Sequence, residues 1–157
     1  MHKSDLIVRI ATQGFIGKSK AAGTVATACT IPLVIAMHFF LFSWMQYFIV
    51  SLLLLGIGSI IVQYALPAFD EPDPGAIVLD EMACFLFVFV GVPITLFSLL
   101  CGFGLFRFFD IVKPLGIKEL ERLPGVYGVM GDDLVAALLS NVALRLCMYG
   151  WHVYNTL

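Results

Sequence analysis

The stretch VATACTIPLVIAMHFFLFSWMQYFIVSLLLLGIGSIIVQY, from Val25 to Tyr64, is apolar except for a weak break at FSWMQYF. A helix needs about 20 predominantly apolar residues to cross a bilayer, so this stretch has room for two crossings. We predict them at Val25–Ser43 and Tyr47–Leu66. Trp44 and Tyr47 lie at the break, where aromatic side chains would gather at a membrane–water interface. The stretch therefore predicts an all-α, polytopic membrane protein.

The composition of the whole chain agrees with this class. Of the 157 residues 61% are hydrophobic and only 13% are charged, against about 25% charged residues in a typical soluble domain. The mean hydropathy is +0.99. The formal net charge of −2 says little by itself, and we expect no nucleic-acid partner. We expect buried thiols at the four cysteines, which lack any metal-ligand spacing: Cys29, Cys84, Cys101 and Cys147.

The central part of the chain allows two arrangements. Between Glu81 and Arg107 lie 25 residues, which suit one long crossing. Two crossings of about 18 residues each become possible if the helices start near Pro74, turn at Gly91–Pro93 and run past Arg107. A later apolar stretch, Leu134–Trp151, predicts a further crossing, with Asp132 and Asp133 capping its start. At the amino terminus, MHKSDLIVRIATQ has no apolar run long enough for a cleaved signal peptide.

The placement of charges favours the hairpin. With a hairpin over residues 75–112, all eleven acidic residues and every cationic residue except Arg145 fall on one side of the membrane. The positive-inside rule makes that side cytoplasmic. We therefore predict a single integral membrane domain over residues 1–157, with about five helical segments and four to five spans. Its amino terminus would lie inside and its carboxyl terminus outside.

This topology gathers four polar stretches at the cytoplasmic face. They are GKSKAAGT (17–24), DEPDPGAIVLDE (70–81), FRFFDIVKP (106–114) and GVYGVMGDD (125–133). On a helix, Arg107, Asp110 and Pro114 would share one face, as would Asp73 and Asp80. An ionisable group at membrane depth costs about 2.5–3.5 kcal/mol on insertion scales, so a cluster of them indicates a functional site.

The residue types in these stretches indicate the chemistry. Carboxylates without nearby histidine or cysteine favour a hard cation, Mg²⁺ first and Mn²⁺ second; they are Asp80, Glu81, Asp110, Asp132 and Asp133. The interspersed cations favour an anionic ligand, most naturally a phosphate; they are Lys18, Lys20, Arg107 and Lys113. A metal between the carboxylates and a phosphate would reconcile the two sets of charges. Phosphoryl transfer or hydrolysis on a membrane substrate is the leading interpretation.

In these stretches the chain resembles the phosphatidylglycerophosphatase A family. The residues that carry the resemblance are Asp73-Pro74, IVLDE (77–81), FRFFDIVKP (106–114), GVMGDD (128–133) and the pair Gly23-Thr24. The resemblance implies a Mg²⁺-dependent enzyme that removes the phosphate from phosphatidylglycerol phosphate at the cytoplasmic face of the bacterial inner membrane. The first motif departs from the family, because Lys20 and Ala22 stand at its two proline positions.

The expected mechanism is metal-assisted hydrolysis of a phosphomonoester. Asp80, Asp132 and Asp133 are the predicted Mg²⁺ ligands. Glu81 or Asp110 is the predicted general base, and an aspartyl-phosphate formed on Asp110 stays open. The predicted substrate-binding residues, for phosphate and headgroup, are Lys18, Lys20, Thr24, Asp73, Arg107 and Lys113.

Each of these residues also has a structural interpretation. Asp132 and Asp133 could be helix caps, Arg107 and Asp110 a plain i, i+3 ion pair, and Lys113 a side chain that snorkels to headgroups. The spacing of Cys101 and Arg107 matches C-x5-R of cysteine phosphatases, but it lies in an apolar span. Two other classes of function remain: a small ion- or proton-coupled transporter and a non-catalytic membrane assembly subunit.

Overall fold

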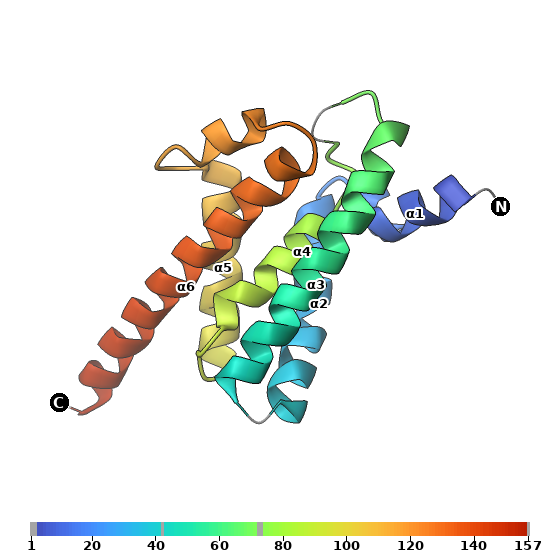
Figure 1. Cartoon of the computed structure of the whole chain (residues 1–157). Coiled ribbons are helices and arrows are strands. Elements are labelled where there is room, and N and C mark those ends of the chain that lie inside the picture. Colours follow the sequence, from blue (N-terminus) through green and yellow to red (C-terminus); the bar gives the residue numbers. More distant parts are fainter. Residues whose placement is uncertain (1–2, 42, 72–73, 157) are drawn as a thin grey trace.

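The computed structural model describes residues 3–41, 43–71 and 74–156 (Figure 1). Every regular element in these residues is helical. In chain order they are α1 (Lys3–Ala11), η1 (Ile16–Lys18), α2 (Ala22–Phe40), α3 (Trp44–Ala65), η2 (Leu66–Ala68), α4 (Leu79–Phe85), η3 (Leu86–Phe89), α5 (Leu96–Val112), η4 (Ile117–Arg122) and α6 (Val126–Thr156). The all-α fold class predicted from the sequence is confirmed.

Helices α2 and α3 lie close to the two predicted crossings. The break between them works as a helix start: Gln46 N donates to Ser43 Oγ (3.2 Å), and Ser43 N donates to Gln46 Oε1 (3.1 Å). This reciprocal capping satisfies backbone groups that the first turn of α3 leaves without partners. By length and composition, three helices in the described part of the chain could cross a membrane: α2, α3 with η2, and α6 as far as Trp151.

The predicted central hairpin exists, but its first arm is much shorter than expected. α4 has seven residues and η3 four, and together they form the segment 79–89, which we call the α4–η3 arm. At about 1.5 Å per residue in α4 and about 2.0 Å per residue in η3, this arm is about 18 Å long, a little more than half of a bilayer core of about 30 Å. The turn follows at Gly91, where φ is +65°, and α5 returns with 17 residues.

The arm is short because the backbone before it is already engaged elsewhere. The prediction that the helix starts near Pro74 is therefore wrong. Ile77 N donates to Pro74 O (2.8 Å), which closes a turn, and Val78 N donates to Ala11 O (3.1 Å). A helix that ran through this segment would have to give up the bond to Ala11. The helix therefore begins at Leu79.

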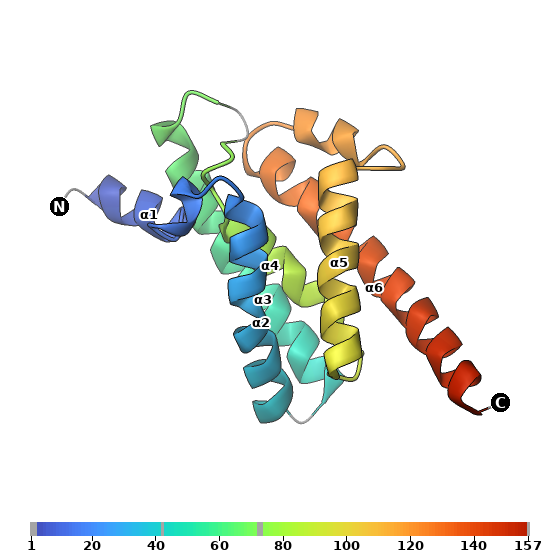
Figure 2. The same cartoon turned by 180° about the vertical axis from the view of Figure 1, so that it is seen from behind.

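The α4–η3 arm lies at the centre of the bundle, between α2, α3 and α6 (Figures 1 and 2). Its Phe85, Leu86 and Val88 are almost completely buried. Phe85 makes edge-to-face contacts with Phe89 and Phe103, with ring centroids 5.2 and 6.5 Å apart. The hydrophobic core is therefore built around an element that is too short to cross a bilayer by itself.

Helix α6 starts earlier than the sequence suggested. It begins at Val126, directly after Gly125, whose left-handed φ of +60° prevents the helix from starting earlier. Asp132 and Asp133 therefore lie inside the helix, and the interpretation of these two residues as caps is wrong. Towards its carboxyl end α6 leans away from the other helices (Figure 1).

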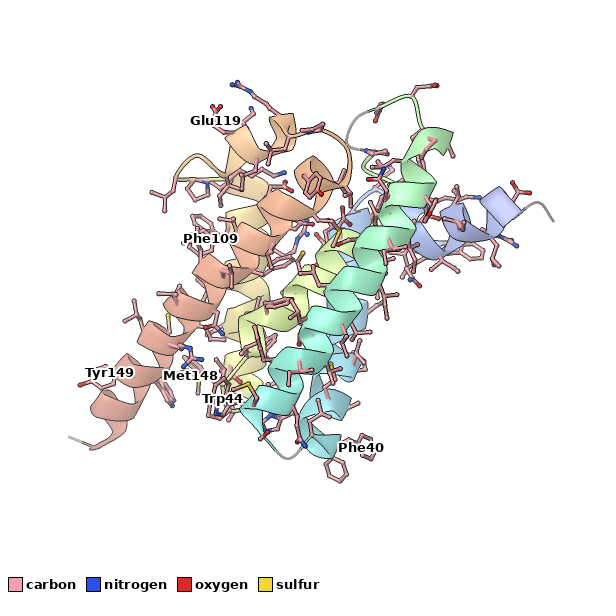
Figure 3. All side chains as sticks on the ribbon, viewed as in Figure 1. Phe40, Trp44, Phe109, Glu119, Met148 and Tyr149 are labelled. Atoms are coloured by element: carbon pink, nitrogen blue, oxygen red, sulfur yellow. The ribbon has the colours of Figure 1, made fainter. Side chains whose placement is uncertain are left out.

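The segments that carry the polar stretches meet at one end of the bundle. The start of α6, the end of α5 and the end of α3 all lie at this end, and Glu119 projects from it in Figure 3. Phe40 and Trp44 mark the opposite end in the same view. α1, which the sequence analysis did not predict, lies crosswise beside the end of α3 (Figures 1 and 2).

Candidate active site

The adjacent acids Asp80 and Glu81 occupy the first turn of α4, not a position two turns into a helix as expected. Carboxylates are favourable there because the positive end of the helix dipole points towards them. Asp80 is 5% exposed, and its Oδ1 accepts a hydrogen bond from Glu81 N (2.9 Å). The helix dipole therefore reduces the free-energy cost of burying these two carboxylates, but part of that cost remains.

Three helices bring the predicted carboxylates to a single small cavity. It has a volume of about 100 Å³, and we call it the acidic cavity. Asp110 comes from the last turn of α5, and Asp132 and Asp133 come from α6; the two α6 acids are each 4% exposed. Its acidic lining residues are Asp80, Glu81, Asp110, Asp132 and Asp133, and its other lining residues are Pro74, Gly75, Ile77, Lys113 and Val129.

Arg107 joins two of these helices. Its Nη1 lies 2.6 Å from Asp110 Oδ2 on the same helix and 3.2 Å from Glu81 Oε1 on α4. The predicted i, i+3 pair with Asp110 is therefore present, and Arg107 forms a second ion pair, with Glu81. Arg107 Nε is buried and makes no hydrogen bond within the described residues. Arg107 is thus held by both candidate bases and keeps a donor that a further acceptor could use.

Lys113 ends α5 in a left-handed conformation, with φ 47° and ψ 51°. Its Nζ lies 2.5 Å from Asp132 Oδ2 and 2.6 Å from Glu121 Oε1. Burial lowers the pKa of Lys113, but the two hydrogen-bonded carboxylates outweigh burial and raise this pKa above its ordinary value. Lys113 is therefore a fixed cation of the site and not a side chain that snorkels to solvent.

Glu121 is a site residue that the sequence analysis missed. It lies in the segment KELER, which reads as a solvated charged run. Its contact with Lys113 arises only because η4 folds back over the end of α5 and packs against α6. No local spacing could have indicated that contact.

Gly23, in the first turn of α2, lies at a position where a side chain would have no room, which explains the glycine in the first motif. A Cβ at this position would overlap Glu81 Oε1. The Glu81 carboxylate therefore rests directly against the backbone of α2, and it makes its contact with Arg107 from there. Any larger residue at position 23 would have to displace the Glu81 side chain.

Of the predicted substrate-binding residues that the structure describes, Lys113 lines the acidic cavity, Arg107 lies beside it through its contacts with Glu81 and Asp110, and the others do not line it. Lys18 and Lys20 are exposed and Thr24 is half-buried. Asp73 lies outside the described residues. Lys18 instead lines a different, larger cavity next to α1, so its predicted place in the charged site is wrong.

The cysteines are not arranged for phosphate chemistry. Residues 101–107 all lie within α5, so their backbone amides are used in the helix and cannot cradle a phosphate. Cys84 is buried beside the site, where its Sγ contacts Met130 O at 3.7 Å. Cys101 is half-buried, whereas Cys29 and Cys147 are exposed, so burial of all four thiols was wrongly predicted. On α2 and α6 these two sulfurs face outward from the bundle.

The donors of the acidic cavity suit a hard divalent cation in type. The cavity is lined by five carboxyl groups, against one cationic side chain in the lining, Lys113, and one beside it, Arg107. A dication would offset this imbalance. Within the described residues, however, no three Asp, Glu, His or Cys side chains converge closely enough to form a metal site. In this arrangement Lys113 and Arg107 hold Asp132, Asp110 and Glu81 instead.

The bundle has apolar helices of membrane-spanning length. At one end it holds buried carboxylates together with an arginine and a lysine. These features define a membrane protein with a charged site for a polar ligand. Residues 9–148 match the family Phosphatidylglycerophosphatase A. The chain belongs to this family, as the resemblance in the sequence predicted.

Two curated relatives are similar over part of the chain. A Haemophilus influenzae protein named "Phosphatidylglycerophosphatase A" is 33% identical over 95 residues, which cover 59% of this chain and 58% of that protein. A Bacteroides thetaiotaomicron protein named "Putative phosphatidylinositol-3-phosphatase" is 36% identical over 80 residues, covering 49% of this chain and 50% of that protein. The chain thus spans about half the length of the curated relatives it matches. No solved structure matches the chain.

Proposed function

We propose that this protein is a Mg²⁺-dependent lipid phosphatase that hydrolyses the phosphomonoester of phosphatidylglycerol phosphate to phosphatidylglycerol. The family match over residues 9–148 supports the reaction class. The observation that carries the proposal is the meeting of three family motifs in the acidic cavity, which brings five carboxylates together with Lys113 and, beside them, Arg107. The reaction would belong to the synthesis of phosphatidylglycerol and cardiolipin.

In this proposal Asp80, Asp132 and Asp133 hold Mg²⁺. When bound, the ion would neutralise charge on the phosphate oxygens and lower the pKa of a coordinated water. The excess of carboxylates over cationic side chains in the acidic cavity supports a dication there. Lys113 would then exchange part of its contact with Asp132 for the phosphate.

Arg107 would bind the substrate phosphate from its position beside the acidic cavity. Its guanidinium already lies between Glu81 and Asp110, and its Nε has a hydrogen atom to donate. Either carboxylate could take the proton from an attacking water as the bond from phosphorus to the glycerol oxygen breaks. Attack by Asp110 itself, followed by hydrolysis of the aspartyl-phosphate, is the second route.

The test is phosphate release from phosphatidylglycerol phosphate in detergent micelles, with Mg²⁺ and with a chelator. We expect release by the unmodified protein only with Mg²⁺, loss of release in Asp80→Asn, and retained release in Cys101→Ser. Cys101 lies on α5 but outside the acidic cavity, so it is the matched control. Release by Asp80→Asn at the level of the unmodified protein would refute the proposed site. No release by the folded unmodified protein under any metal would refute the phosphatase and favour a non-catalytic subunit.

A second lipid is a candidate substrate, with a different headgroup. The Bacteroides thetaiotaomicron relative carries a name that refers to phosphatidylinositol 3-phosphate, and the first motif of this chain has Lys20 and Ala22 at the positions where the family has prolines. Phosphatidylinositol 3-phosphate therefore belongs in the same assay at the same lipid fraction. Faster release from this lipid would reassign the substrate and leave the site and reaction unchanged.

A further inference from the structure

A second cavity lies beside the acidic one, and it is considerably larger, at about 480 Å³. We call it the N-terminal cavity, because α1 and η1 form one side of it and the segment after α3 forms the other. Its main lining side chains are Val8, Arg9, Thr12, Phe15, Lys18 and Phe69. None of these residues lines the acidic cavity.

The lining combines two kinds of side chain. Val8 and Phe69 are half-buried apolar walls, and Phe15 is 93% exposed at the edge. Arg9 and Lys18 are both exposed and supply the charge. Among the described lining residues there is no acidic side chain, in contrast to the acidic cavity. An occupant should therefore have an anionic part beside an apolar part.

The position of the cavity indicates where such an occupant comes from. Lys18 lies just before the start of α2, and Phe69 directly follows η2 at the end of α3. α2 and α3 with η2 are helices of membrane-spanning length, and when they cross a bilayer their ends would lie at the level of its phosphates. α1 extends sideways at this level (Figures 1 and 2).

The two cavities share a wall. Ala76 lines the N-terminal cavity, whereas its neighbours Gly75 and Ile77 line the acidic cavity. Val78 N donates to Ala11 O (3.1 Å), and Gly17 packs so closely on Ala76 O that a Cβ there would overlap it. The segment that leads into Asp80 is thus fixed against the elements that form the N-terminal cavity.

We propose that the N-terminal cavity binds one anionic phospholipid of the surrounding bilayer. The lipid phosphodiester would contact Arg9 and Lys18, and its acyl chains would pack on Val8, Phe15 and Phe69. Charge complementarity and the level of the cavity carry this assignment. The site is separate from the one that would hydrolyse the substrate, so its test does not depend on enzymatic activity.

The experiment places a fluorescent reporter at the edge of the cavity. Phe15→Trp is introduced with Trp44→Phe and Trp151→Phe, and quenching by brominated phosphatidylglycerol is compared with quenching by brominated phosphatidylcholine in mixed micelles. Arg9 and Lys18, at about 1 kcal/mol for each cation near an anionic lipid, together contribute about 2 kcal/mol, so we expect half-quenching at a roughly 30-fold lower fraction of phosphatidylglycerol. Arg9→Gln with Lys18→Gln should abolish this preference.

The controls separate the proposed site from general charge effects. Lys118→Gln with Arg122→Gln removes two exposed cations from η4 and should leave the preference intact. Soluble glycerol 3-phosphate should not relieve the quenching. Equal quenching by both lipids, an unchanged preference in the Arg9 and Lys18 variant, or relief by glycerol 3-phosphate would each overturn the proposal. Gel filtration of every variant confirms that it is folded.

Discussion

At the scale of single residues, the site depends on how closely a few charges approach one another. Arg107 contacts Glu81 and Asp110, and Lys113 contacts Asp132. In a partly desolvated site each of these ion pairs is stronger than it would be on the surface. Removing one partner is strongly destabilising, because it leaves the other charge buried without compensation. The acids and the pair of Arg107 with Asp110 could be identified from the sequence. The contacts of Arg107 with Glu81 and of Lys113 with Asp132 could not, because these partners lie 26 and 19 residues away along the chain.

Gly23→Ala is the sharpest test of this packing. The new Cβ would overlap Glu81 Oε1, so Glu81 must leave its place beside Arg107. Because a displacement of about 1 Å at a catalytic group can cost up to 100-fold, we expect phosphate release to fall by 10- to 100-fold. The measurement is the initial rate on phosphatidylglycerol phosphate micelles with Mg²⁺.

Gly104→Ala is the matched control for this prediction. It is also a helical glycine, and a Cβ there meets nothing within 4 Å. We expect the rate to stay unchanged and stability to hold or rise slightly, since alanine favours the helix. Full activity in Gly23→Ala would contradict the role assigned to the contact between Glu81 and α2.

At the scale of elements, the α4–η3 arm is the unusual feature. A helix that ends inside a bundle leaves carbonyl oxygens without partners, which is costly away from water. Asn141 on α6 resolves this: its Nδ2 lies 3.2 Å from Phe87 O, 2.8 Å from Val88 O and 3.1 Å from Val90 O. Arg145 Nη2 adds a contact with Val90 O at 2.7 Å. Asn141 and Arg145, two polar residues within a predicted span, thus supply hydrogen bonds to the end of the arm.

Asn141→Leu should therefore destabilise the protein. The end of the arm would lose its donors from Nδ2, and buried carbonyls without partners cost about 1–3 kcal/mol. The measurement is the apparent melting temperature in detergent.

Ser140→Ala is the control at the neighbouring position. Its Oγ bonds only within α6, to Ala136 O at 2.7 Å, so its removal should change the melting temperature far less. Equal melting temperatures for Asn141→Leu and the unmodified protein would show that the arm does not need this support.

At the scale of the whole molecule, the elements that line the acidic cavity meet at one end of the bundle (Figure 1), which we call the charged end. Glu119 marks the charged end, and Phe40 and Trp44 mark the other (Figure 3). The positive-inside rule favours a cytoplasmic location for the charged end. The proposed substrate would then be hydrolysed on the cytoplasmic side of the membrane.

This orientation can be tested by thiol labelling. The four native cysteines are replaced by alanine, and a single cysteine is introduced as Glu119→Cys or Gln46→Cys. In spheroplasts a membrane-impermeant maleimide should label Gln46→Cys only, and lysis should expose Glu119→Cys. Labelling of Glu119→Cys in intact spheroplasts would reverse the proposed orientation.

The sequence by itself determined the class, the α2–α3 pair, the position of the central turn and the family. These features depend on local hydropathy, on capping residues such as Ser43 and on short motifs. Only the tertiary structure decided that the α4–η3 arm is half a crossing, that Asp132 and Asp133 lie inside α6, and that Glu121 and Gly23 belong to the site. These outcomes depend on hydrogen bonds and packing between distant segments, such as Val78 with Ala11, and no local pattern records such contacts.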